Sequence, residues 1–412
     1  MLDVVVVGLG GVGSFCLRSL SKRRRLHGGS FGSGGLSQIA GIERYTRLHD
    51  RGSSHGGSRI YRKAYFEGPQ YVPWIQYSER VFQELSRNKN GDNDLIENCG
   101  TLIIEEPGGP LVEACSASAE EWNIPTEFLT NMELRQRYPQ FKLASDNTVG
   151  LFEPGGGFIR PERAMEAALN EAEANGAEIF EELIVDRLEE VDNHVEIHTS
   201  RVHNKSPDIV IQAKAVIIAS GSWTSSLIPS WAPYLTVTRQ VQAWIDVGDD
   251  DSYLPRNFST WCMSTPHHPI TLYGVPRDPL AHAATPSGWI KFGLHGRDDR
   301  VADPSSMLRL VTELERQELC WEAAKVSLHS VSGSPASSIS SAKPCLYTMS
   351  PDGHFLLGRP SEYQRVVAVA GLSGHGFKMT PALGEMLCDL VLDEDFGKWN
   401  AESLSPSRFI KA

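Results

Sequence analysis

The chain has 412 residues, of which 41% are hydrophobic and 22% are charged, a composition typical of a globular protein with room for two domains. Its formal net charge of −12 argues against a nucleic-acid partner, because phosphate binding requires a positive face. No apolar run approaches the ~20 residues that span a bilayer, so we expect no membrane partner. A small anionic substrate stays compatible with this charge, since a few local cations override the global sign.

The two ends of the chain bear on the cellular location of the protein, and the cysteines bear on whether it contains disulfides or a metal site. The apolar run Val4–Val7 is too short for a signal peptide and lacks a basic lead, so we expect an intracellular, cytoplasmic protein. The final residues SRFIKA are not an S-K-L-type signal, and a peroxisomal location stays an open alternative. The seven cysteines are scattered and form no CxxC pair. We therefore expect neither a disulfide framework nor a metal site.

A nucleotide motif opens the chain. Residues 3–7 predict a buried strand that runs into a glycine turn and a helix. Gly8, Gly10 and Gly13 form G-x-G-x-x-G directly after that strand. The first glycine permits the tight turn, the second lets the backbone approach a pyrophosphate, and the third lets helix and strand pack closely. The pattern predicts a dinucleotide site, against the alternative of a glycine turn without a ligand.

The second strand of such a unit should end in an acidic residue that binds ribose hydroxyls. Glu43, in SQIAGIERY, fills this place, although it lies further from Gly13 than the about 20 positions that the fingerprint expects. The extra length lies in 22–37, which is basic and then rich in Gly and Ser, so we interpret it as a flexible loop. Its basic residues Lys22–Arg25 are interpreted as a solvated helix end, with a contact patch as the alternative.

Helices and strands then alternate. Helices are predicted over 67–87 and 160–176, the second with Gly176 as its stop. The strand predicted over 209–221 ends at Gly221, in a tight turn that is suited to approach the same nucleotide. Strands are predicted over 99–106, 177–182, 194–200 and 209–221.

Residues 235–330 carry no second dinucleotide motif. A helix is predicted over 307–319, and strands are predicted over 241–247, 270–276 and 288–296. Lys291 alternates with apolar residues in the last of these strands, and an inward-facing lysine should be functional or ion-paired because it loses its hydration. Cys345 lies in a stretch rich in turn formers, and taken alone it favours a small buried hydrophobe.

The chain closes by repeating its opening architecture. Residues 364–392 predict a strand, a loop with Gly371, Gly374 and Gly376, and a helix with Thr380 as its N-cap. Two such units so far apart predict one discontinuous nucleotide domain that a second domain interrupts. The late helix N-terminus suits negative charge on a reduced cofactor ring, and the alternative is a glycine-lined helix entry without a ligand.

Several sequence blocks carry a family resemblance, and they cover nearly the whole chain. They are VVVVGLGGVG, SSHGGSRIYRKAYFEGPQYVP, LFEPGGGFIRPERA, IKFGLH, KPCLYTMSPDGHFLLG and GLSGHGFKMTPALGE. In these blocks and their order the chain resembles the monomeric sarcosine oxidase and N-methyltryptophan oxidase family of FAD-dependent amine oxidases, which includes pipecolate oxidases. The segment after Lys22 departs from the family pattern.

The resemblance implies an α/β fold with two domains and the flavin ring at their junction. A Rossmann-type FAD-binding domain, discontinuous in sequence, should comprise residues 1–88, 148–234 and 331–412. A mixed-sheet, α+β substrate domain should be inserted as residues 89–147 and 235–330.

The resemblance also implies roles for single residues. Cys345 matches the cysteine of a CxYT segment that carries the flavin through a thioether to its 8-methyl group. Arg62 and Lys378 match the pair that grips a substrate carboxylate, and Arg59 matches a position near the flavin face. Without the family, two arginines three positions apart are more often a pair of surface residues or members of a structural ion pair.

Further implied residues surround the ring. Lys291 matches the lysine that activates dioxygen, where a positive charge stabilises superoxide. His295 resembles the active-site histidine, and Tyr273 and Tyr347 match aromatic positions of the substrate pocket; each would otherwise pass for a core residue. The remaining implied cofactor neighbours, besides the first glycines and Glu43, are His55, Ser58, Val185, Gly221, Gly374, Gly376 and Lys378.

These features predict a monomeric FAD-dependent oxidase of amino acids with a secondary amine, such as sarcosine or pipecolate, that yields an imine and hydrogen peroxide. Alternatives are an FAD dehydrogenase that passes electrons to a carrier, a fructosyl-amino-acid oxidase, an adenylating enzyme with a similar glycine loop, and a non-catalytic flavin-binding protein. The missing CxxC pairs count against the adenylating enzyme. A carboxylate clamp together with Lys291 counts against the non-catalytic protein.

Overall fold

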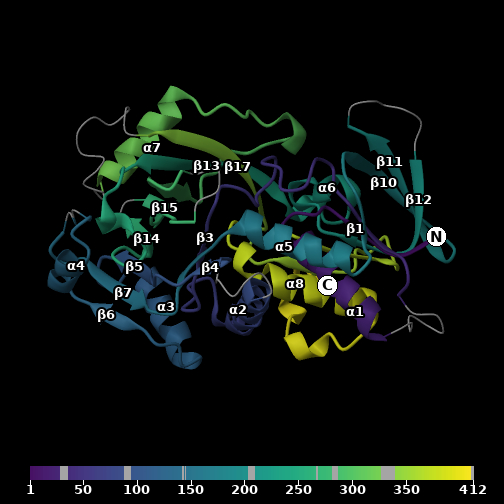
Figure 1. The fold of residues 1–412 in the computed structure, drawn as a ribbon, viewed down its shortest axis with the longest axis horizontal. Coiled ribbons are helices and arrows are strands. Elements are labelled where there is room, and N and C mark those ends of the chain that lie inside the picture. The colour runs from purple at the N-terminus through teal and green to yellow at the C-terminus, as the bar shows by residue number, and fades with distance from the viewer. Residues whose placement is uncertain are drawn as a thin grey trace.

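The computed structural model describes residues 1–27, 36–87, 94–141, 143, 145–202, 209–265, 268–280, 286–325 and 339–409. Two large mixed sheets lie toward opposite ends of an elongated molecule, and a group of helices lies along one side of it (Figure 1). This arrangement confirms the α/β class and the Rossmann-type sheet that the sequence predicts. Among the described helices, none is both long enough and apolar enough to cross a membrane.

The first sheet is built around the opening strand. It contains β1 (Leu2–Val7), β2 (Ile39–Ile42), β9 (Glu178–Phe180), β10 (Leu183–Val191), β11 (His194–Arg201), β12 (Ile209–Ile218), β18 (Leu356–Gly358) and β19 (Val366–Ala370). Its order is β10-β11-β12-β1-β2-β9, with β19 beside β12 and β18 beside β19. β1 pairs in parallel with β2 and β12. Val4, Val5 and Val6 are fully buried, as expected for a parallel strand that is covered on both faces.

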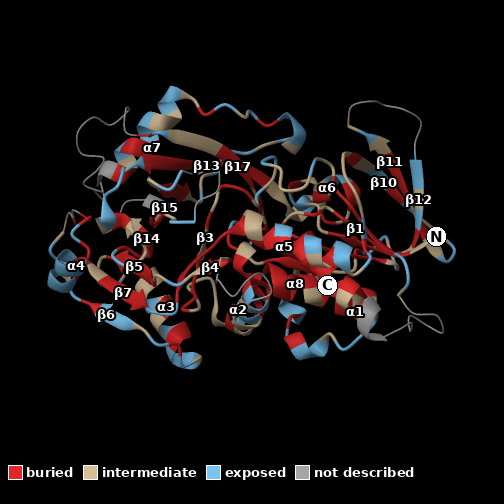
Figure 2. Ribbon diagram, in the orientation of Figure 1, coloured by how far each residue is buried: buried red, intermediate tan, exposed pale blue. Residues whose placement is uncertain are grey.

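The helices cover this sheet and the sides of the second one. They are α1 (Gly11–His27), α2 (Val72–Arg87), α3 (Pro110–Glu121), α4 (Asn131–Arg137), α5 (Pro161–Ala174), α6 (Thr224–Leu227), α7 (Glu313–Lys325) and α8 (Thr380–Val391). α1 packs against both α5 and α8, and Figure 2 colours much of α1 and α8 as buried. A Cβ on Gly384 of α8 would lie 2.7 Å from the backbone nitrogen of Cys16, so the glycine permits this close approach.

The basic end of α1 differs from the expectation. Lys22 forms a half-exposed ion pair with Glu84 at 2.7 Å, which fits a solvated helix end. Arg23 is instead buried and pairs with Asp389 and Glu385 of α8 at 2.5 and 2.6 Å. The interpretation of Arg23 as solvated was wrong, because α1 continues to His27 and keeps this side chain against α8.

The second sheet supplies the other wall of the molecule. Its strands are β5 (Thr101–Glu105), β6 (Glu127–Leu129), β7 (Val149–Glu153), β13 (Thr236–Asp246), β14 (Thr260–Thr265), β15 (His268–Val275), β16 (Trp289–His295) and β17 (Ser341–Met349), in the order β17-β13-β16-β15-β14-β5-β7-β6. A small third sheet joins β3 (Arg59–Tyr61), β8 (Gly157–Ile159) and β4 (Ile96–Glu97). Cys345 therefore lies in a regular strand, and the turn formers of its stretch follow at 350–353, after β17 ends.

Three details correct the sequence-based expectations. The helix predicted over 307–319 begins at Glu313, because Thr312 and Glu315 form a capping box. The Glu315 carboxylate accepts the Thr312 backbone N–H at 2.8 Å, and the Thr312 hydroxyl accepts the Glu315 backbone N–H at 3.3 Å. Thr380 is not an N-cap acceptor, since its hydroxyl donates to the Phe377 carbonyl at 2.9 Å. The predicted loop 22–37 begins as helix up to residue 27, and its residues 28–35 lie outside the described part of the chain.

The division into two domains stays a prediction. Two strands pair on the other side of its proposed boundaries. β7 and β17 both pair within the second sheet, although the division assigns 148–234 and 331–412 to the FAD-binding part. The strand that carries Cys345 thus belongs to the opposite wall from the glycine turn of β1.

The Gly13 position tests the helix–strand packing. A Cβ there would lie 1.8 Å from the Gly8 carbonyl oxygen, so we expect Gly13→Ala to lower the free energy of unfolding by about 3 kcal/mol through overpacking. Urea unfolding of the purified variant measures this. Gly155→Ala is the control, because its Cβ would meet only the flexible end of Lys63 at 3.3 Å. Equal stability of the two variants would contradict the packing described here.

Candidate active site

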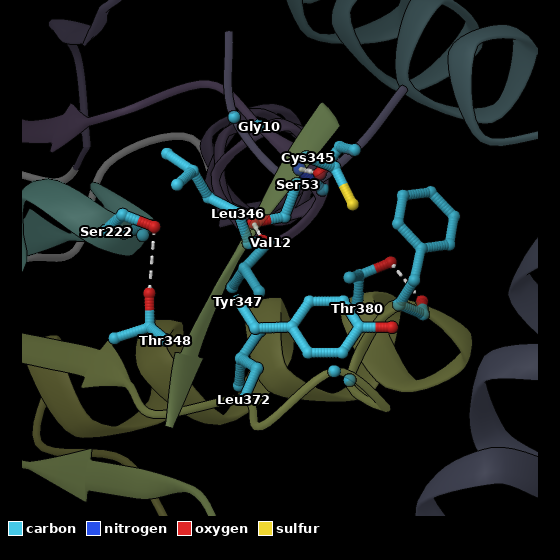
Figure 3. A pocket seen from close by; sticks show the side chains of 18 of the residues that line it. Gly10, Val12, Ser53, Ser222, Cys345, Leu346, Tyr347, Thr348, Leu372 and Thr380 are labelled. Atoms are coloured by element: carbon cyan, nitrogen blue, oxygen red, sulfur yellow. Dashed lines mark hydrogen bonds between the residues drawn. The ribbon is translucent and has the colours of Figure 1, made fainter. Parts of the chain in front are cut away.

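A cavity of about 280 Å³ lies between the turn after β1 and one face of the second sheet. Figure 3 shows part of it, with Gly10 and Val12 of the first turn behind Cys345 and Tyr347 of β17. Gly13 and His55 do not line it. The predicted residues that do are Gly8, Gly10, Glu43, Ser58, Arg59, Arg62, Val185, Gly221, Tyr273, Lys291, His295, Cys345, Tyr347, Gly374, Gly376 and Lys378.

The opening glycines form a tight turn that leaves space in front of α1. Gly8 has a φ of 87° and lies against Ala219, whose carbonyl oxygen would be 2.7 Å from an added Cβ. A Cβ on Gly10 would instead meet nothing closer than Ser54 Oγ at 3.7 Å. The N-terminus of α1 therefore opens onto the cavity. The Ser54 hydroxyl accepts the Gly11 backbone N–H at 3.1 Å, and the neighbouring backbone N–H groups of this turn suit an anion.

Glu43 lies at the end of β2, as the sequence predicts. Its carboxylate accepts the Leu9 backbone N–H at 2.8 Å and the Tyr45 backbone N–H at 3.1 Å. His49 Nε2 lies 3.2 Å from the same carboxylate. These contacts fix Glu43 beside the glycine turn, where a ribose of a bound nucleotide would lie.

One face of the second sheet brings the other predicted side chains together. Residues paired across antiparallel strands share a face, and so do residues two apart along a strand. The register pairs Trp244 with Lys291 across β13 and β16, and Gln240 with Cys345 across β13 and β17. By the same rule the face that carries Lys291 also carries Tyr273, His295, Cys345 and Tyr347.

The late glycine loop closes over this face. A Cβ on Gly374, whose φ is 83°, would lie 2.3 Å from Tyr347 Cε2 and 2.8 Å from His295 Cε1. His295 Nδ1 lies 3.4 Å from the Tyr347 hydroxyl. Burial lowers the pKa of His295, with Lys378 acting in the same direction against Glu67, so its imidazole is neutral near pH 7.

Lys291 is buried and holds the backbone turn of residues 55–58. Its Nζ donates to the carbonyls of Gly56 and Ser58 at 3.0 and 2.9 Å. On the same turn, Glu162 accepts the backbone N–H of Gly56 at 2.6 Å. Burial lowers the pKa of Lys291 well below its ordinary value, and Arg59 lowers it further while Glu162 opposes both. An anion arriving beside Lys291 would therefore favour its charged form.

Arg62 is buried and already has an acidic partner that the sequence did not reveal. Its Nη2 lies 2.5 Å from Glu67 Oε2, and its Nη1 donates to the Ala64 carbonyl at 2.8 Å. Burial alone would raise the pKa of Glu67, but Arg62, His375 and Lys378 hold it at about 2. Glu67 is thus a resident carboxylate in the place predicted for a substrate carboxylate.

Lys378 is oriented by a second buried network. Its Nζ donates to the Tyr65 hydroxyl at 3.1 Å and to the His375 carbonyl at 3.0 Å. The Tyr65 hydroxyl lies 2.8 Å from His375 Nδ1, and His375 Nε2 lies 3.1 Å from the Gly353 carbonyl. Burial lowers the pKa of Lys378 to about 8, with Glu67 raising it and Arg62 lowering it. Tyr65, Glu67 and His375 were missed because their contacts depend on how the chain folds around Arg62 and Lys378 and not on a local sequence pattern.

The remaining predicted residues lie in the wall of the cavity or behind it. Arg59 donates to the carbonyls of Ser58 and His55, each at 2.7 Å. His55 is buried behind the lining, and neither of its ring nitrogens has a hydrogen bond among the described residues. Val185 and Gly221 reach the cavity from the first sheet.

The residues present fit FAD. An anion fits the open N-terminus of α1, and Glu43 offers a carboxylate at the position that binds ribose in dinucleotide folds. The cavity also contains an orphaned polar group, since neither side-chain amide atom of buried Gln242 has a partner among the described residues. Buried polar groups are rarely left unpaired without a reason, so this cavity is suited to a polar ligand.

Comparisons with known proteins agree with this geometry. A family model described as FAD dependent oxidoreductase matches residues 3–390. The chain is 30% identical over 395 residues to a monomeric sarcosine oxidase of Streptomyces avermitilis, covering 95% of this chain and 93% of that protein. It is 27% identical over 393 residues to an N-methyl-L-tryptophan oxidase of Yersinia pestis, covering 95% of each. The solved structure of NikD, an unusual amino acid oxidase essential for nikkomycin biosynthesis, shares the fold with a TM-score of 0.78 at 20% identity, covering 98% of this chain and 97% of that one. The chain therefore belongs to the FAD-dependent oxidoreductase family, in the group of the monomeric sarcosine oxidases and N-methyltryptophan oxidases.

Proposed function

We propose that this protein oxidises amino acids whose nitrogen is a secondary amine, such as sarcosine, pipecolate or another N-alkyl amino acid, and passes the electrons to dioxygen. The observation that carries the proposal is one cavity lined by two pairs of cations: Arg62 with Lys378, both buried, and buried Lys291 with half-buried Arg59. The first group suits a carboxylate and the second suits reduced oxygen. The two curated relatives, which by name act on sarcosine and N-methyl-L-tryptophan, support this substrate class.

FAD, when bound, supplies the two-electron acceptor for the amine. Gly8, Gly10 and the first turn of α1 would hold its pyrophosphate, and Glu43 its ribose. Cys345 would carry its ring through a thioether. The further contacts that we propose are Ser58, Val185, Gly221, Gly374 and Gly376, with His55 acting through Arg59.

The substrate carboxylate would bind to unused donors of Arg62 and Lys378. A guanidinium has five N–H groups and an ammonium has three, whereas the described residues engage two nitrogens of Arg62 and two directions around Lys378 Nζ. The substrate carboxylate therefore adds to Glu67 rather than replacing it. This grip fixes the oxidisable C–H bond over the cavity, which is the orientation part of catalysis.

The amine must lose its proton before its C–H bond is oxidised. His295 is the neutral imidazole at the cavity, and its Nδ1 approaches the Tyr347 hydroxyl at 3.4 Å. We assign to His295 the acceptance of that proton, and to Tyr273 and Tyr347 the aromatic walls of the substrate pocket. Water then hydrolyses the imine of an N-methyl substrate to formaldehyde, whereas a cyclic substrate leaves as a cyclic imine.

The proposed oxidase reaction separates into two half-reactions that spectroscopy tests. We expect anaerobic sarcosine or pipecolate to bleach the flavin absorbance, and air to restore it with one equivalent of peroxide. Lys291→Met should leave the bleaching intact but slow reoxidation about a hundredfold, because it removes a cation at the site of developing charge. Stopped-flow absorbance measures both rates.

Lys343→Met is the control for that experiment. Lys343 lies on β17, which β13 separates from the strand of Lys291. Its Nζ is 3.9 Å from Asp50 and its side chain is 39% exposed. An unchanged reoxidation rate in Lys291→Met would remove Lys291 as an argument for an oxidase over the dehydrogenase alternative. No bleaching by any secondary-amine amino acid in the wild type would end the proposal.

The covalent link predicts flavin that survives denaturation. We expect acid-precipitated wild type to stay yellow and its flavin to map to the peptide that contains Cys345, whereas Cys345→Ser should release FAD. Cys262→Ser is the matched control, because Cys262 is another buried cysteine that lines the cavity. Colour lost from the wild type, or retained by Cys345→Ser, would refute the assignment of Cys345.

The carboxylate grip predicts a pH dependence. Lys378 is charged below its pKa of about 8, so we expect acetate, a simple carboxylate, to bind about tenfold more weakly for each pH unit above that value. Titration of the flavin absorbance with acetate between about pH 6.5 and about pH 9.5 measures the dissociation constant. In Lys378→Met the affinity should be weak and flat with pH. A flat profile in the wild type would remove Lys378 from the grip.

A further inference from the structure

The Gln242 side chain is buried in the cavity wall without a partner. Gln242 is 2% exposed, and among the described residues neither its Nε2 nor its Oε1 has a hydrogen bond. An unpaired buried amide costs about 1–3 kcal/mol. The proposed binding and oxidation steps do not use this group.

The register places Gln242 between the two chemical groups of the sheet face. It pairs with Lys343 on β17 and with Gly293 on β16. Its diagonal neighbours on the same face therefore include Cys345 and Lys291, besides Ser341 and His295. Diagonal Cβ atoms lie within reach of a long side chain. The Gln242 side chain thus spans the space between the cysteine and the lysine.

Gly56 keeps the amide in that space. A Cβ at Gly56, whose φ is 102°, would lie 2.3 Å from Gln242 Oε1 and 3.2 Å from its Nε2. The amide thus packs flat against the turn that Lys291 and Glu162 hold. A larger residue at Gly56 would displace it, so the turn confines the Gln242 side chain as well as Lys291.

We infer that Gln242 is a positioning residue for covalent attachment of the flavin, because its amide N–H donates to the Cys345 sulfur as the thiolate forms. The inference rests on the proposed function of Cys345. In the attachment, the S–H bond and one C–H bond of the flavin 8-methyl group break and an S–C bond forms. Two protons and two electrons leave, and dioxygen takes them up as hydrogen peroxide.

The charges around Cys345 agree with this role. Burial raises the pKa of the Cys345 thiol, whereas Arg59, Lys291, Gln242 and Arg239 favour the thiolate, in decreasing order. Gln242 is the one uncharged side chain among these, so it stabilises the thiolate without adding charge to the cavity. The titratable and charged groups that act on Cys345 from the same side of the sheet are Arg59, Tyr273, Lys291 and Tyr347. Lys343 shares that face, whereas Arg239 acts on Cys345 from the opposite face.

The experiment measures attached and total flavin in purified full-length variants. Gln242→Met keeps the shape but removes the donor, and Gln242→Glu keeps the shape but opposes the thiolate. We expect both to retain total flavin, while the covalent share formed in a fixed time at about pH 7 falls at least about tenfold, as for a thiol pKa raised by one unit. Gel fluorescence of the denatured protein, compared with the absorbance of the native protein, gives the two quantities.

The pH profile separates positioning from a merely structural role. Incubation of Gln242→Met in air at rising pH should restore attachment toward about pH 10, because the thiol then ionises without help. Gln240→Met is the control: Gln240 directly opposes Cys345, but its amide donates to Thr238 Oγ1 and the Arg297 carbonyl, so attachment should persist.

Three results would overturn the inference. They are an unchanged covalent share in both Gln242 variants, a loss that high pH does not reverse, and a loss of total flavin from both variants, which would make Gln242 a ligand of FAD itself. A wild type without covalent flavin would refute the role of Cys345 first, and the same gel distinguishes that outcome.

Discussion

The site depends on the register of β13 between β16 and β17. This register turns the side chains of Lys291 and Cys345, which belong to different strands, to one face of the sheet. A slip of one residue in either ladder would turn one of these residues away, since side chains alternate along a strand. The sheet face therefore works as a rigid plate, and the loops after β1 and β19 bring the nucleotide-binding glycines to it.

The second constraint is electrostatic. The chain carries a net charge of −12, yet the described cavity lining has more basic than acidic side chains: Arg44, Arg59, Arg62, Lys291 and Lys378 against Glu43 and Glu67. Removing a cation from water costs several kcal/mol unless partners compensate it. Backbone carbonyls compensate Lys291 and Arg59, and Glu67 compensates Arg62. The site thus keeps its cations near anionic ligands at a cost to stability.

Much of this arrangement could be predicted from the sequence, in those segments whose structure is determined by residues close together in the chain. The buried valines, the three glycines and the helix after them specify the first βα unit without help from the rest of the chain. Glu43 was found by its place after the second strand, despite its unusual distance from the motif. The start of α7 could also have been predicted, because Thr312 and Glu315 form a capping-box pattern that was overlooked.

Other features depend on contacts that no local pattern encodes. Arg23 resembles any basic residue at a helix end until α8 supplies Asp389 beneath it. Glu67 follows Arg62 closely in sequence, but its ion pair depends on the course of the chain between them. Gln242 reads as a polar residue in a strand, and its unpaired amide becomes visible only when the turn at Gly56 is placed against it.

The two cation groups are not interchangeable, and this asymmetry gives the orientation of the substrate. Lys291 Nζ donates to the Gly56 and Ser58 carbonyls, and burial lowers its pKa and so disfavours its charged form. Lys378 keeps its charge up to about pH 8 because Glu67 lies near it. A carboxylate entering the cavity therefore gains most at Lys378, which is the side where His375 and Tyr65 fix the ammonium. Under the function proposed above, the amine end then faces Tyr347 and His295, and Lys291 stays available for a charge that appears only during the reaction.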